Sequence, residues 1–450
     1  MVELQIEALG ESHQRSPIEN RQSNIPLFIA FRVLFNARWY YPVLAVLFQD
    51  FGLSIAQYAM LNVVWAAAIV GFEIPLGALA DQIGRKKMVV LASSLMVVEL
   101  ALFAFAPLGN PSLAFWFFAL NRLLSGAAEA SANGADEALA YESLEPDQRA
   151  YEWPRVLESQ MRWQSAGFFI AMMIGAVVYS EGAVQTIIHT LGLPWSVTHH
   201  TTMRFPIYLT LLNAVLALVV SLKMREAATV TRTASSKAAL RDTLVTGLWI
   251  LRTPLPLAII LGGFVIDNIV RLFMTMVSNY YRLIALPDAS FGVIGSGMAV
   301  IGFFTPQLAR WLVGRNPMRA NFAIIAMSVM IGLIGAALAL PIYGLIFLVP
   351  IGAAISLNQF FVSHYLNATV TDTRLRATVL SFRGLAYNLA YGVVGILYSW
   401  LTHALRNRGT PEMVFGQSLR WLPWYFAVTV GMLAIAWARL LKAEHSKVES

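Results

Sequence analysis

Residues 77–87 read GALADQIGRKK, and this stretch says more about the fold than any other part of the chain. It joins two long apolar segments, and it combines two glycines and one acid with a terminal run of three cations. Glycine permits a tight turn and a close approach of the backbone, so Gly77 and Gly84 indicate a turn between two helices. Asp81 is an anion at a helix end, where it is suited to meet the positive N-terminus of another helix.

The composition on either side of this stretch is that of a membrane protein. Hydrophobic residues make up 58% of the chain and charged residues 13%, with a mean hydropathy of +0.62. In soluble proteins about a quarter of the residues are charged. The net charge of +7 would suit nucleic acid only if the basic residues gathered on one exposed face, whereas they fall mostly in short loops. We therefore expect the lipid bilayer, and not nucleic acid, as a partner.

Twelve stretches are apolar over roughly the 20 residues that a membrane-spanning helix needs. They are residues 26–49, 55–76, 88–107, 112–134, 158–179, 205–224, 255–283, 290–312, 318–340, 342–367, 378–402 and 421–441. The sequence therefore predicts an all-α polytopic membrane protein with twelve transmembrane helices. The chain has no cysteine, which excludes a disulfide framework and a thiolate metal site.

The basic residues of the connecting segments are unevenly divided between the two sides of the membrane. On the side of the N-terminus 21 Lys and Arg are found, against 5 on the other side. Cytoplasmic loops have an excess of Lys and Arg, so both termini are expected in the cytoplasm and the chain in the cell (inner) membrane. The polar first 24 residues lack the order of a cleavable signal and are interpreted as a cytosolic tail.

The longest inner connection divides six predicted spans from six. The predicted organisation is a cytosolic tail at 1–24, a six-helix bundle at 25–224, a cytosolic linker at 225–253, a second six-helix bundle at 254–441 and a cytosolic tail at 442–450. The longest outer loop, 181–204, contains His189, His199 and His200 without closely spaced carboxylates. We therefore expect a solvated loop there and no metal site.

Residues 77–87 closely resemble the signature of the loop between helices 2 and 3 in the major facilitator superfamily. The resemblance extends to span count, topology and central linker, and it implies two pseudo-symmetric six-helix bundles and a secondary transporter of bacterial type, with the subfamily unresolved. It also implies that Asp81 faces the start of helix 11, near 376–378, in the outward-open state. Arg85 would pair with an acid at the end of helix 4, for which Asp136 is the best match. The implied conformational motif is Gly77, Asp81, Gly84, Arg85, Lys86 and Asp136.

A second, shorter resemblance concerns proton coupling. Arg122, in the sequence NRLLSG at 121–126, resembles an arginine motif of helix 4 that is associated with proton coupling in this family. Glu129 lies on the same helical face as Arg122, because residues three and four apart share a face. The proton-coupling candidates are therefore Arg122, Glu129 and Asp267, with Glu129 preferred.

Polar residues within the spans predict the central cavity, because charges inside a membrane are costly and usually line a cavity or a relay. The resemblance implies that helices 1, 4, 7 and 10 line it. The candidates are Arg32, Asn36, Arg38, Tyr40, Asn268, Arg271, Asn358, Gln359 and His364. Alternatively, a pair such as Asp267 with Arg271 has a purely structural role and holds helices together without binding the substrate. A surplus of arginine favours an anionic substrate, because guanidinium binds such groups bidentately.

Alternating-access transport of a small solute, driven by a proton or another ion gradient, is the function that these observations favour. The chain lacks the G-x-x-x-x-G-K-[ST] loop of ATP-driven proteins. A multidrug/proton antiporter is an alternative. The drug antiporters of this family have a glycine-proline motif in helix 5, whereas here Gly167 and Gly175 stand in that helix without the expected proline. A receptor or sensor without turnover is an alternative of a different class. An intramembrane enzyme would need convergent catalytic groups; we expect no enzymatic activity, no cofactor and a monomer.

Overall fold

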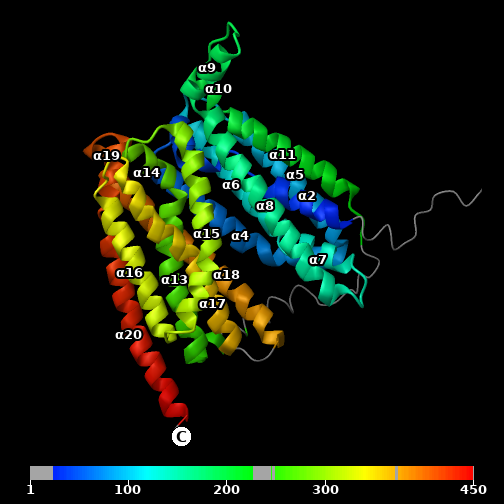
Figure 1. Ribbon diagram of the computed structural model, residues 1–450, viewed down its shortest axis with the longest axis vertical. Coiled ribbons are helices and arrows are strands. Elements are labelled where there is room, and N and C mark those ends of the chain that lie inside the picture. The colour runs from blue at the N-terminus through cyan, green and yellow to red at the C-terminus, as the bar shows by residue number, and fades with distance from the viewer. Residues whose placement is uncertain (1–23, 227–244, 246–248, 370–372, 449–450) are drawn as a thin grey trace, which may run out of the picture.

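The computed structural model describes residues 24–226, 245, 249–369 and 373–448, and every regular element in these ranges is a helix (Figure 1). The predicted N-terminal tail, except for Asn24, and most of the linker at 225–253 lie outside the described residues. The side chains of Asp81 and of residues 376–378 also lie outside the described part of the structure. The predicted contact between Asp81 and the start of helix 11 is therefore not described either.

The N-terminal half contains six of the predicted spans. Its elements are α2 (Asn24–Asn36), η3 (Tyr41–Val43), α3 (Leu44–Asp50), α4 (Ile55–Ile83), α5 (Arg85–Ala104), α6 (Pro111–Ala132), α7 (Ala135–Glu142), α8 (Arg149–Tyr179), α9 (Glu181–Thr190), α10 (His199–Thr202) and α11 (Phe205–Lys223). The first span is therefore two helices, α2 and α3, separated by an irregular stretch and a 3-10 turn.

The C-terminal half contains the other six predicted spans. Its elements are α13 (Pro254–Thr275), α14 (Val277–Leu283), η4 (Asp288–Ser290), α15 (Phe291–Val313), α16 (Met318–Ala337), η5 (Tyr343–Phe347), α17 (Leu348–Thr369), α18 (Thr373–Leu405), η6 (Arg406–Arg408), α19 (Pro411–Leu419) and α20 (Leu422–Val448). α20 continues beyond the predicted end of its span at 441.

Nine helical segments of the described part are long and apolar enough to cross a membrane. The three predicted spans that do not meet this criterion coincide with α2 and α3, with α6 and with α18. The first is interrupted, and α6 contains both Arg122 and Glu129. Two of these segments nevertheless expose large apolar side chains, among them Trp116 on α6 and Trp400 on α18.

The turn predicted at 77–87 is shorter in the structure. α4 begins at a capping box, in which the Ser54 side chain accepts from the Gln57 N–H and the Gln57 side chain accepts from the Ser54 N–H. It then continues to Ile83, because residues 77–83 are mostly good helix formers. Gly84 alone separates α4 from α5, and its φ of +98° is a conformation that favours glycine.

The two halves lie side by side and meet most closely toward one end (Figure 1). We call this the α9 end, because α9 and α10 project from it; the opposite end, where α7 lies and α18 begins, is the α7 end. Contact between the halves runs along α4 with α18 and along α8 with α15. At Gly292 of α15, an added Cβ would lie 2.2 Å from the carbonyl oxygen of Met172 on α8. The backbones of the two halves touch there.

Candidate functional site

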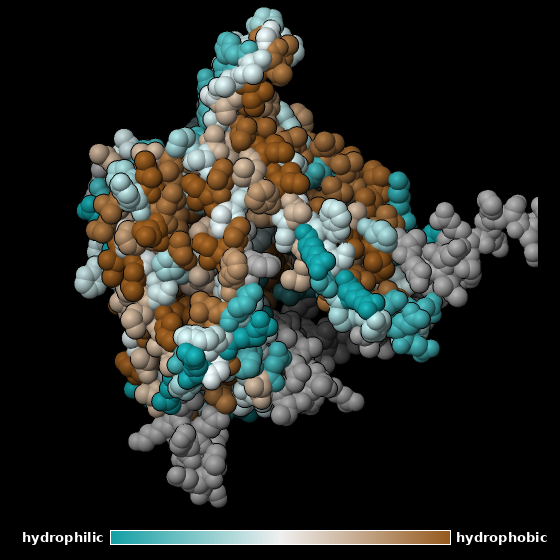
Figure 2. Space-filling model, in the orientation of Figure 1, coloured by the Kyte–Doolittle hydropathy of each residue, from teal (hydrophilic) through white to brown (hydrophobic). Residues whose placement is uncertain are grey.

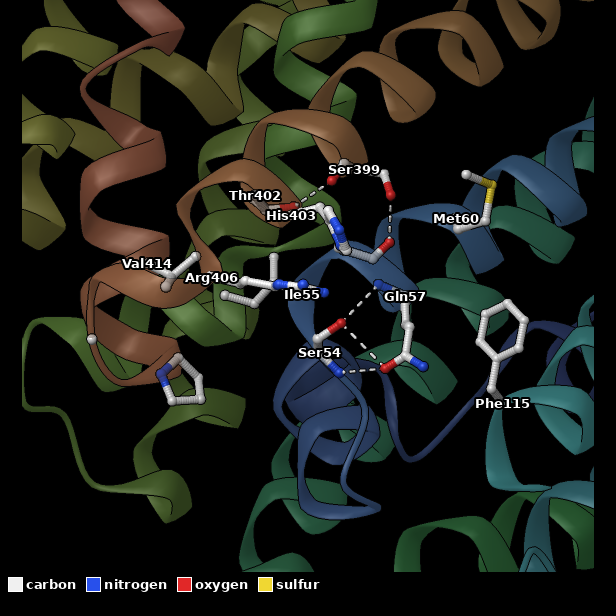
Figure 3. Close-up of a pocket in the computed structure, with 13 residues that line it drawn as sticks. Ser54, Ile55, Gln57, Met60, Phe115, Ser399, Thr402, His403, Arg406 and Val414 are labelled. Atoms are coloured by element: carbon white, nitrogen blue, oxygen red, sulfur yellow. Dashed lines mark hydrogen bonds between the residues drawn. The ribbon is translucent and has the colours of Figure 1, made fainter. Parts of the chain in front are cut away.

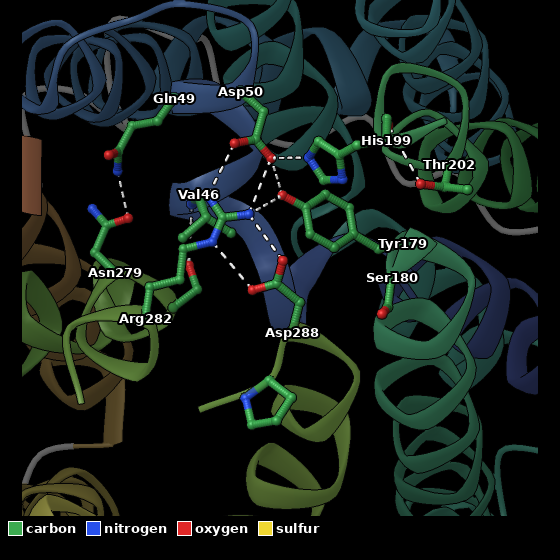
Figure 4. A network of polar contacts seen from close by, with 12 residues as sticks. Val46, Gln49, Asp50, Tyr179, Ser180, His199, Thr202, Asn279, Arg282 and Asp288 are labelled. Carbon is green, nitrogen blue, oxygen red and sulfur yellow. Dashed lines mark hydrogen bonds and ion pairs between the residues drawn. The ribbon is translucent and has the colours of Figure 1, made fainter. Parts of the chain in front are cut away.

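A polar network joins the two halves at the α9 end (Figure 4). Arg282 of α14 donates to both carboxylate oxygens of Asp50 on α3, at 2.9 and 3.2 Å. It also donates to Asp288 of η4 at 3.1 and 3.0 Å and to the Tyr179 hydroxyl of α8 at 2.8 Å. Tyr179 in turn donates to Asp50. One guanidinium of the C-terminal half is therefore bonded to two elements of the N-terminal half.

His199 completes this network, with its Nε2 2.8 Å from Asp50 Oδ2. The expectation of a solvated loop around His199 is therefore wrong for this residue. Sequence spacing does not show the contact, because Asp50 and His199 are 149 residues apart. Within the described residues, no group of three or more His, Cys, Asp or Glu is placed to bind a metal ion.

Further contacts between the halves lie just below this network. The Ser278 hydroxyl accepts from the backbone N–H of Ala45 at 3.0 Å, and the Tyr58 hydroxyl donates to the Thr275 carbonyl at 2.8 Å. On the other side of the seam, Ser399 of α18 donates to the Ala56 carbonyl at 2.8 Å. These contacts and the Asp50 network close the α9 end.

A cavity of about 420 Å³ lies between the halves below the closed end. It takes residues from both bundles, and Figure 2 shows that the molecular surface is hollowed between them. The lining residues are Arg38, Tyr40, Tyr41, Leu44, Asn62, Trp65, Arg122, Ser125, Glu129, Asp267, Arg271, Thr275, Ile355, Gln359 and Tyr391. The three proton-coupling candidates, which come from α6 and α13, are thus brought into one cavity.

A second cavity of about 450 Å³ shares Asp267, Arg271 and Gln359 with the first. It also includes Asn358, near the middle of α17, and Arg383, near the start of α18. Since α18 begins at the α7 end, the combined cavity extends from the middle of the molecule toward that end.

Two of the three arginines that line the first cavity, of about 420 Å³, are bonded to carboxylates. Arg38, 2% exposed, is bonded to Glu99 of α5, which is 1% exposed; the distance between Nη1 and Oε1 is 2.5 Å. Asn121 also donates to Glu99, so this acid is held by two partners. Arg271 Nη2 lies 2.7 Å from Asp267 Oδ2, one turn away on α13.

The third arginine, Arg122, has no such partner. It is 8% exposed, and its Nε and Nη2 atoms are buried without a hydrogen-bond partner. Its guanidinium carbon lies 4.9 Å from the centre of the Phe48 ring, a cation–π contact. Glu129, two turns further along α6, is 36% exposed, and its Oε1 lies 3.9 Å from Arg38 Nη2. Among the residues that line the cavity of about 420 Å³, one arginine is therefore without a carboxylate partner and one acid is loosely held.

At the α7 end, the N-terminus of α5 is capped by an acid from a distant segment. Glu226, which follows α11, accepts from the backbone N–H groups of Arg85 and Lys86 at 2.9 and 3.0 Å. A carboxylate is favourable at a helix N-terminus, where N–H groups have no partner within the helix. A Cβ on Gly84 would lie 2.8 Å from Glu226 Oε2, so the capping carboxylate occupies the space that a side chain would need.

Comparison with known proteins supplies the family. The protein-family model of the Major Facilitator Superfamily matches residues 27–395 of the sequence. The chain belongs to this superfamily. It is therefore a multi-pass membrane protein and a secondary transporter, from a family that is generally non-enzymatic.

Solved structures agree with this assignment. The nucleoside transporter NupG matches with a TM-score of 0.69 at 14% identity, over 94% of this chain and 99% of its own. A bacterial homologue of the human lysosomal transporter Spinster, solved in an inward-facing and unoccupied conformation, matches with a TM-score of 0.67 at 14% identity, over 95% and 98%. A D-xylose-proton symporter matches with a TM-score of 0.60 at 14% identity, over 90% and 96%. No curated protein matches the sequence. At these identities the likeness shows the fold alone.

The pairing that the resemblance implies for Arg85 of this transporter is not found. Arg85 Nε lies 2.9 Å from Glu142 Oε1, and Asp136 instead binds Arg32, whose Nε is 2.6 Å from Asp136 Oδ2. The reason is the break at Gly134, where a φ of +78° ends α6 and begins α7 in a new direction. Asp136 therefore faces α2, and the last residue of α7 faces α5.

Arg32 and Asn36 are not among the residues that line either of the two cavities of about 420 and 450 Å³. Their predicted position assumed one continuous first helix that also contains Tyr40, but α2 ends at Asn36 and Tyr40 follows an irregular stretch. Arg32 binds Asp136 and Glu137, and Asn36 donates to the Arg32 carbonyl. Only the part of the predicted face after the break, including Arg38 and Tyr40, lines the cavity.

Two further candidates also lie elsewhere in the transporter. Asn268 is buried and donates to the Phe264 carbonyl within α13. His364 is exposed and stacks on Phe360, with ring centroids 6.1 Å apart. Residues missed by the sequence analysis include Asn62 and Trp65 of α4 and Tyr391 of α18. The spacing of Tyr387, Tyr391 and Asn388 on one predicted helix was the signal available for α18.

A third cavity, of about 550 Å³, lies at the α9 end of the seam between α4 and α18 (Figure 3). Its walls come from both halves of the transporter and include Ile55, Met60, Phe115 and Val414, with His403 and Arg406 on one side. It shares no lining residue with the central cavity, and the candidate residues of the sequence analysis are not among those that line it.

Proposed function

We propose that this transporter moves a small organic solute across the inner membrane by alternating access, coupled to a proton gradient, and that the structure represents its inward-open state. The observation that supports this proposal is the asymmetry of the molecule. The Asp50–Arg282 network closes the α9 end, whereas the cavity extends toward the α7 end. A solute site that is closed at one end and reached from the other is one of the two states that alternating access requires.

The orientation that we propose places the α7 end in the cytoplasm. The excess of Lys and Arg in the segments at the α7 end supports this orientation. It puts both termini in the cytoplasm and assigns 25–224 and 254–441 to the two bundles, with 225–253 as a cytosolic linker between them. We further propose that the transporter acts as a monomer, because the central cavity is lined from within one chain.

Glu129 is the proton carrier in this proposal. Of the two cavity acids, Asp267 lies 2.7 Å from Arg271, whereas the closest cation to Glu129 lies at 3.9 Å. A carboxylate without a close ion pair can take up and release a proton at a smaller cost in broken contacts. The match with a structure named as a proton symporter also supports a proton as the coupling ion. The surplus arginine on the cavity wall supports an anionic organic solute.

Proteoliposomes with an imposed pH gradient test the proposal, with a labelled solute taken from a thermal-shift screen. Glu129→Gln should abolish accumulation driven by the gradient while exchange of labelled for unlabelled solute continues. Asp267→Asn distinguishes the second acid, and Glu158→Gln, an exposed acid that pairs with Arg162, is the matched control. Full accumulation by Glu129→Gln would remove it as the carrier. Absence of both exchange and accumulation in the native protein would favour the sensor alternative.

A further inference from the structure

The unpaired guanidinium of Arg122 needs an anion. Arg38 and Arg271 each have a carboxylate at bonding distance, but Arg122 faces the cavity with two buried nitrogen donors unused. A buried charge without a partner is costly, and structures retain one mainly where a ligand supplies the missing charge. The Phe48 contact offsets only part of this cost, because a ring face accepts no directed hydrogen bond from Nε and Nη2.

Arg122 lies on the closed side of Glu129. α6 runs from Pro111 at the α9 end toward α7, so Glu129, seven residues further along, is about 10 Å nearer to the open end. A solute that enters from the α7 end passes Glu129 before it reaches Arg122. An anionic group bound to Arg122 would therefore occupy the deep part of the cavity.

The cavity that contains Arg122 also has four aromatic side chains on its walls. Tyr40 and Tyr41 from the first span, Trp65 from α4 and Tyr391 from α18 all line the same cavity. Aromatic side chains pack best against flat ring systems, in stacked or edge-to-face arrangements. The cavity volume of about 420 Å³ suits a small solute.

On the basis of the proposed function, we infer that the solute is an aromatic organic anion whose carboxylate or similar group binds Arg122 and whose ring packs among Tyr40, Trp65 and Tyr391. The guanidinium matches such a group geometrically, since it can donate two parallel hydrogen bonds to two oxygens. Its position also links solute to proton. An anion at Arg122 cancels part of the positive charge near Glu129, so binding of the anion and protonation of Glu129 favour each other, and the effect is reciprocal.

Binding of simple probes to the purified full-length protein tests the class of solute without any gradient. Equilibrium dialysis with radiolabelled benzoate gives the affinity, and competition by benzenesulfonate, cyclohexanecarboxylate and benzamide separates charge from ring. We expect benzenesulfonate to compete well, cyclohexanecarboxylate weakly and benzamide not at all. Arg122→Gln should weaken benzoate binding by about tenfold or more, because a charge-assisted bidentate contact is lost.

The control variant is Arg162→Gln, which removes an exposed arginine outside the cavity and should bind benzoate as the native protein does. Arg122→Lys keeps the charge but loses the fork geometry, so its affinity should fall between those of the native protein and Arg122→Gln. If Arg122→Gln is folded, as its thermal unfolding would show, and binds benzoate with native affinity, the inference is wrong. Equal competition by benzamide would contradict the anion, and equal competition by cyclohexanecarboxylate would contradict the ring. No binding of benzoate at millimolar concentration would contradict the class.

The pH dependence of binding tests the link to Glu129. The groups that face this part of the cavity from the surrounding elements are Arg38, Tyr40, Tyr41, Arg122, Asp267, Arg271 and Tyr391. Benzenesulfonate remains ionised at every pH used, so a change in its affinity reports the protein alone. Its affinity should rise as the pH falls, within the range of about 5- to 150-fold that is typical of coupled sites. Glu129→Gln should remove this dependence, whereas Asp267→Asn should keep it; a native dependence in Glu129→Gln would contradict the link.

These results are distinguishable from failure of the proposed function. Binding is measured in detergent, so it does not depend on transport or on a pH gradient. Native-like binding by Arg122→Gln would overturn the inference while gradient-driven uptake could still support proton-coupled transport. Anion binding at Arg122 together with absence of gradient-driven uptake would overturn the proposed function and leave the site intact.

Discussion

Gly84 is a single residue on which the connection of α4 to α5 depends. Its φ of +98° is unfavourable for any residue with a Cβ, and Glu226 fills the adjacent space while it caps α5. Gly77, seven residues earlier in the same motif, lies within α4, and an added Cβ there would meet nothing within 4 Å. Two glycines of one motif therefore have different structural roles.

We predict that Gly84→Ala lowers the stability of the protein by about 1–3 kcal/mol, the usual cost of a strained backbone conformation. Gly77→Ala is the matched control and should be neutral or should stabilise by about 0.5–1 kcal/mol, because alanine is favoured over glycine in a helix. Thermal unfolding of the two purified variants measures the difference. A loss of stability in Gly77→Ala as large as that in Gly84→Ala would contradict this division of roles.

The buried pair of Arg38 and Glu99 leads to a second prediction at this scale. Glu99→Gln removes the close carboxylate partner of the buried Arg38 and leaves it only the distant Glu129 at 3.9 Å, so it should destabilise the protein by about 3–5 kcal/mol. Replacing both residues, as Arg38→Met with Glu99→Leu, should recover much of the loss, because no unpaired charge is left. Unfolding curves of the single and double variants decide the matter. Equal stability of the single and the double variant would show that the charges themselves are not the cause.

At the scale of the helices, the sequence predicts the spans well and their breaks poorly. Bilayer thickness sets the length of an apolar stretch, so the twelve predicted spans all coincide with helices. The interruption at 37–40 and the break between α13 and α14 are local backbone events that apolar composition does not reveal. The misplacement of Arg32 follows directly from the first of these.

The candidate site was predictable where it depends on spacing within one helix. Arg122 and Glu129 share a face of α6, and both line the cavity. The partners of Arg38 and Asp136 were not predictable in this way, because Glu99 and Arg32 are 61 and 104 residues away from them along the chain. Periodicity tells which residues share a face, but the packing of distant helices decides which faces meet.

The Arg282 guanidinium joins four elements at the α9 end, namely α3, α8, α14 and η4. We therefore expect the α9 end to open when this group is removed. Arg282→Gln loses the charged contacts with Asp50 and Asp288 and should shift the population toward the outward-open state. A shift of about 1.4 kcal/mol changes the ratio of the two states tenfold. Arg420→Gln, an exposed arginine before α20, is the control at the same end.

Two single cysteines report this shift, since the native chain has none. Val46→Cys is buried at the closed α9 end and should react faster with a thiol reagent in the Arg282→Gln background. Ser363→Cys lines the cavity on the side of the α7 end and should react more slowly. Unchanged rates for both cysteines would mean that the network does not hold the α9 end closed.

For the whole molecule, closure of one end requires opening of the other, and the motif of α4 is expected to act at the α7 end. In the outward-open state, the Asp81 carboxylate would face the start of α18, where a charge–dipole contact contributes about 0.3–2 kcal/mol. Asp81→Asn should therefore express normally, transport poorly and shift the population further toward the inward-open state. Arg85 is bonded to Glu142 in this structure and belongs to the same motif as Asp81. If the motif acts as one unit, Arg85→Ala should shift the population in the same direction as Asp81→Asn, and the two effects should be less than additive.

The same pair of cysteines measures this prediction. Labelling of Val46→Cys should slow in the Asp81→Asn background, which is the opposite of the result expected for Arg282→Gln. Asp147→Asn, an exposed acid in the connection between α7 and α8, is the control. If Asp81→Asn shows both native labelling and native transport, the motif only fixes the orientation of the helices in the membrane and has no role in the conformational change.

The contact of Gly292 with the Met172 carbonyl has a practical consequence. Only a hydrogen atom fits between α8 and α15 at that point, so even one methyl group would act as a wedge that keeps the halves apart at the α9 end. Gly292→Ala, folded but unable to close there, should accumulate as the outward-open form without any ligand, which fast labelling of Val46→Cys would show; native labelling would mean that the helices yield instead. Such a protein is a suitable antigen for nanobodies against the surface that is hidden in the inward-open form, and these binders would hold native molecules in the opposite half of the transport cycle.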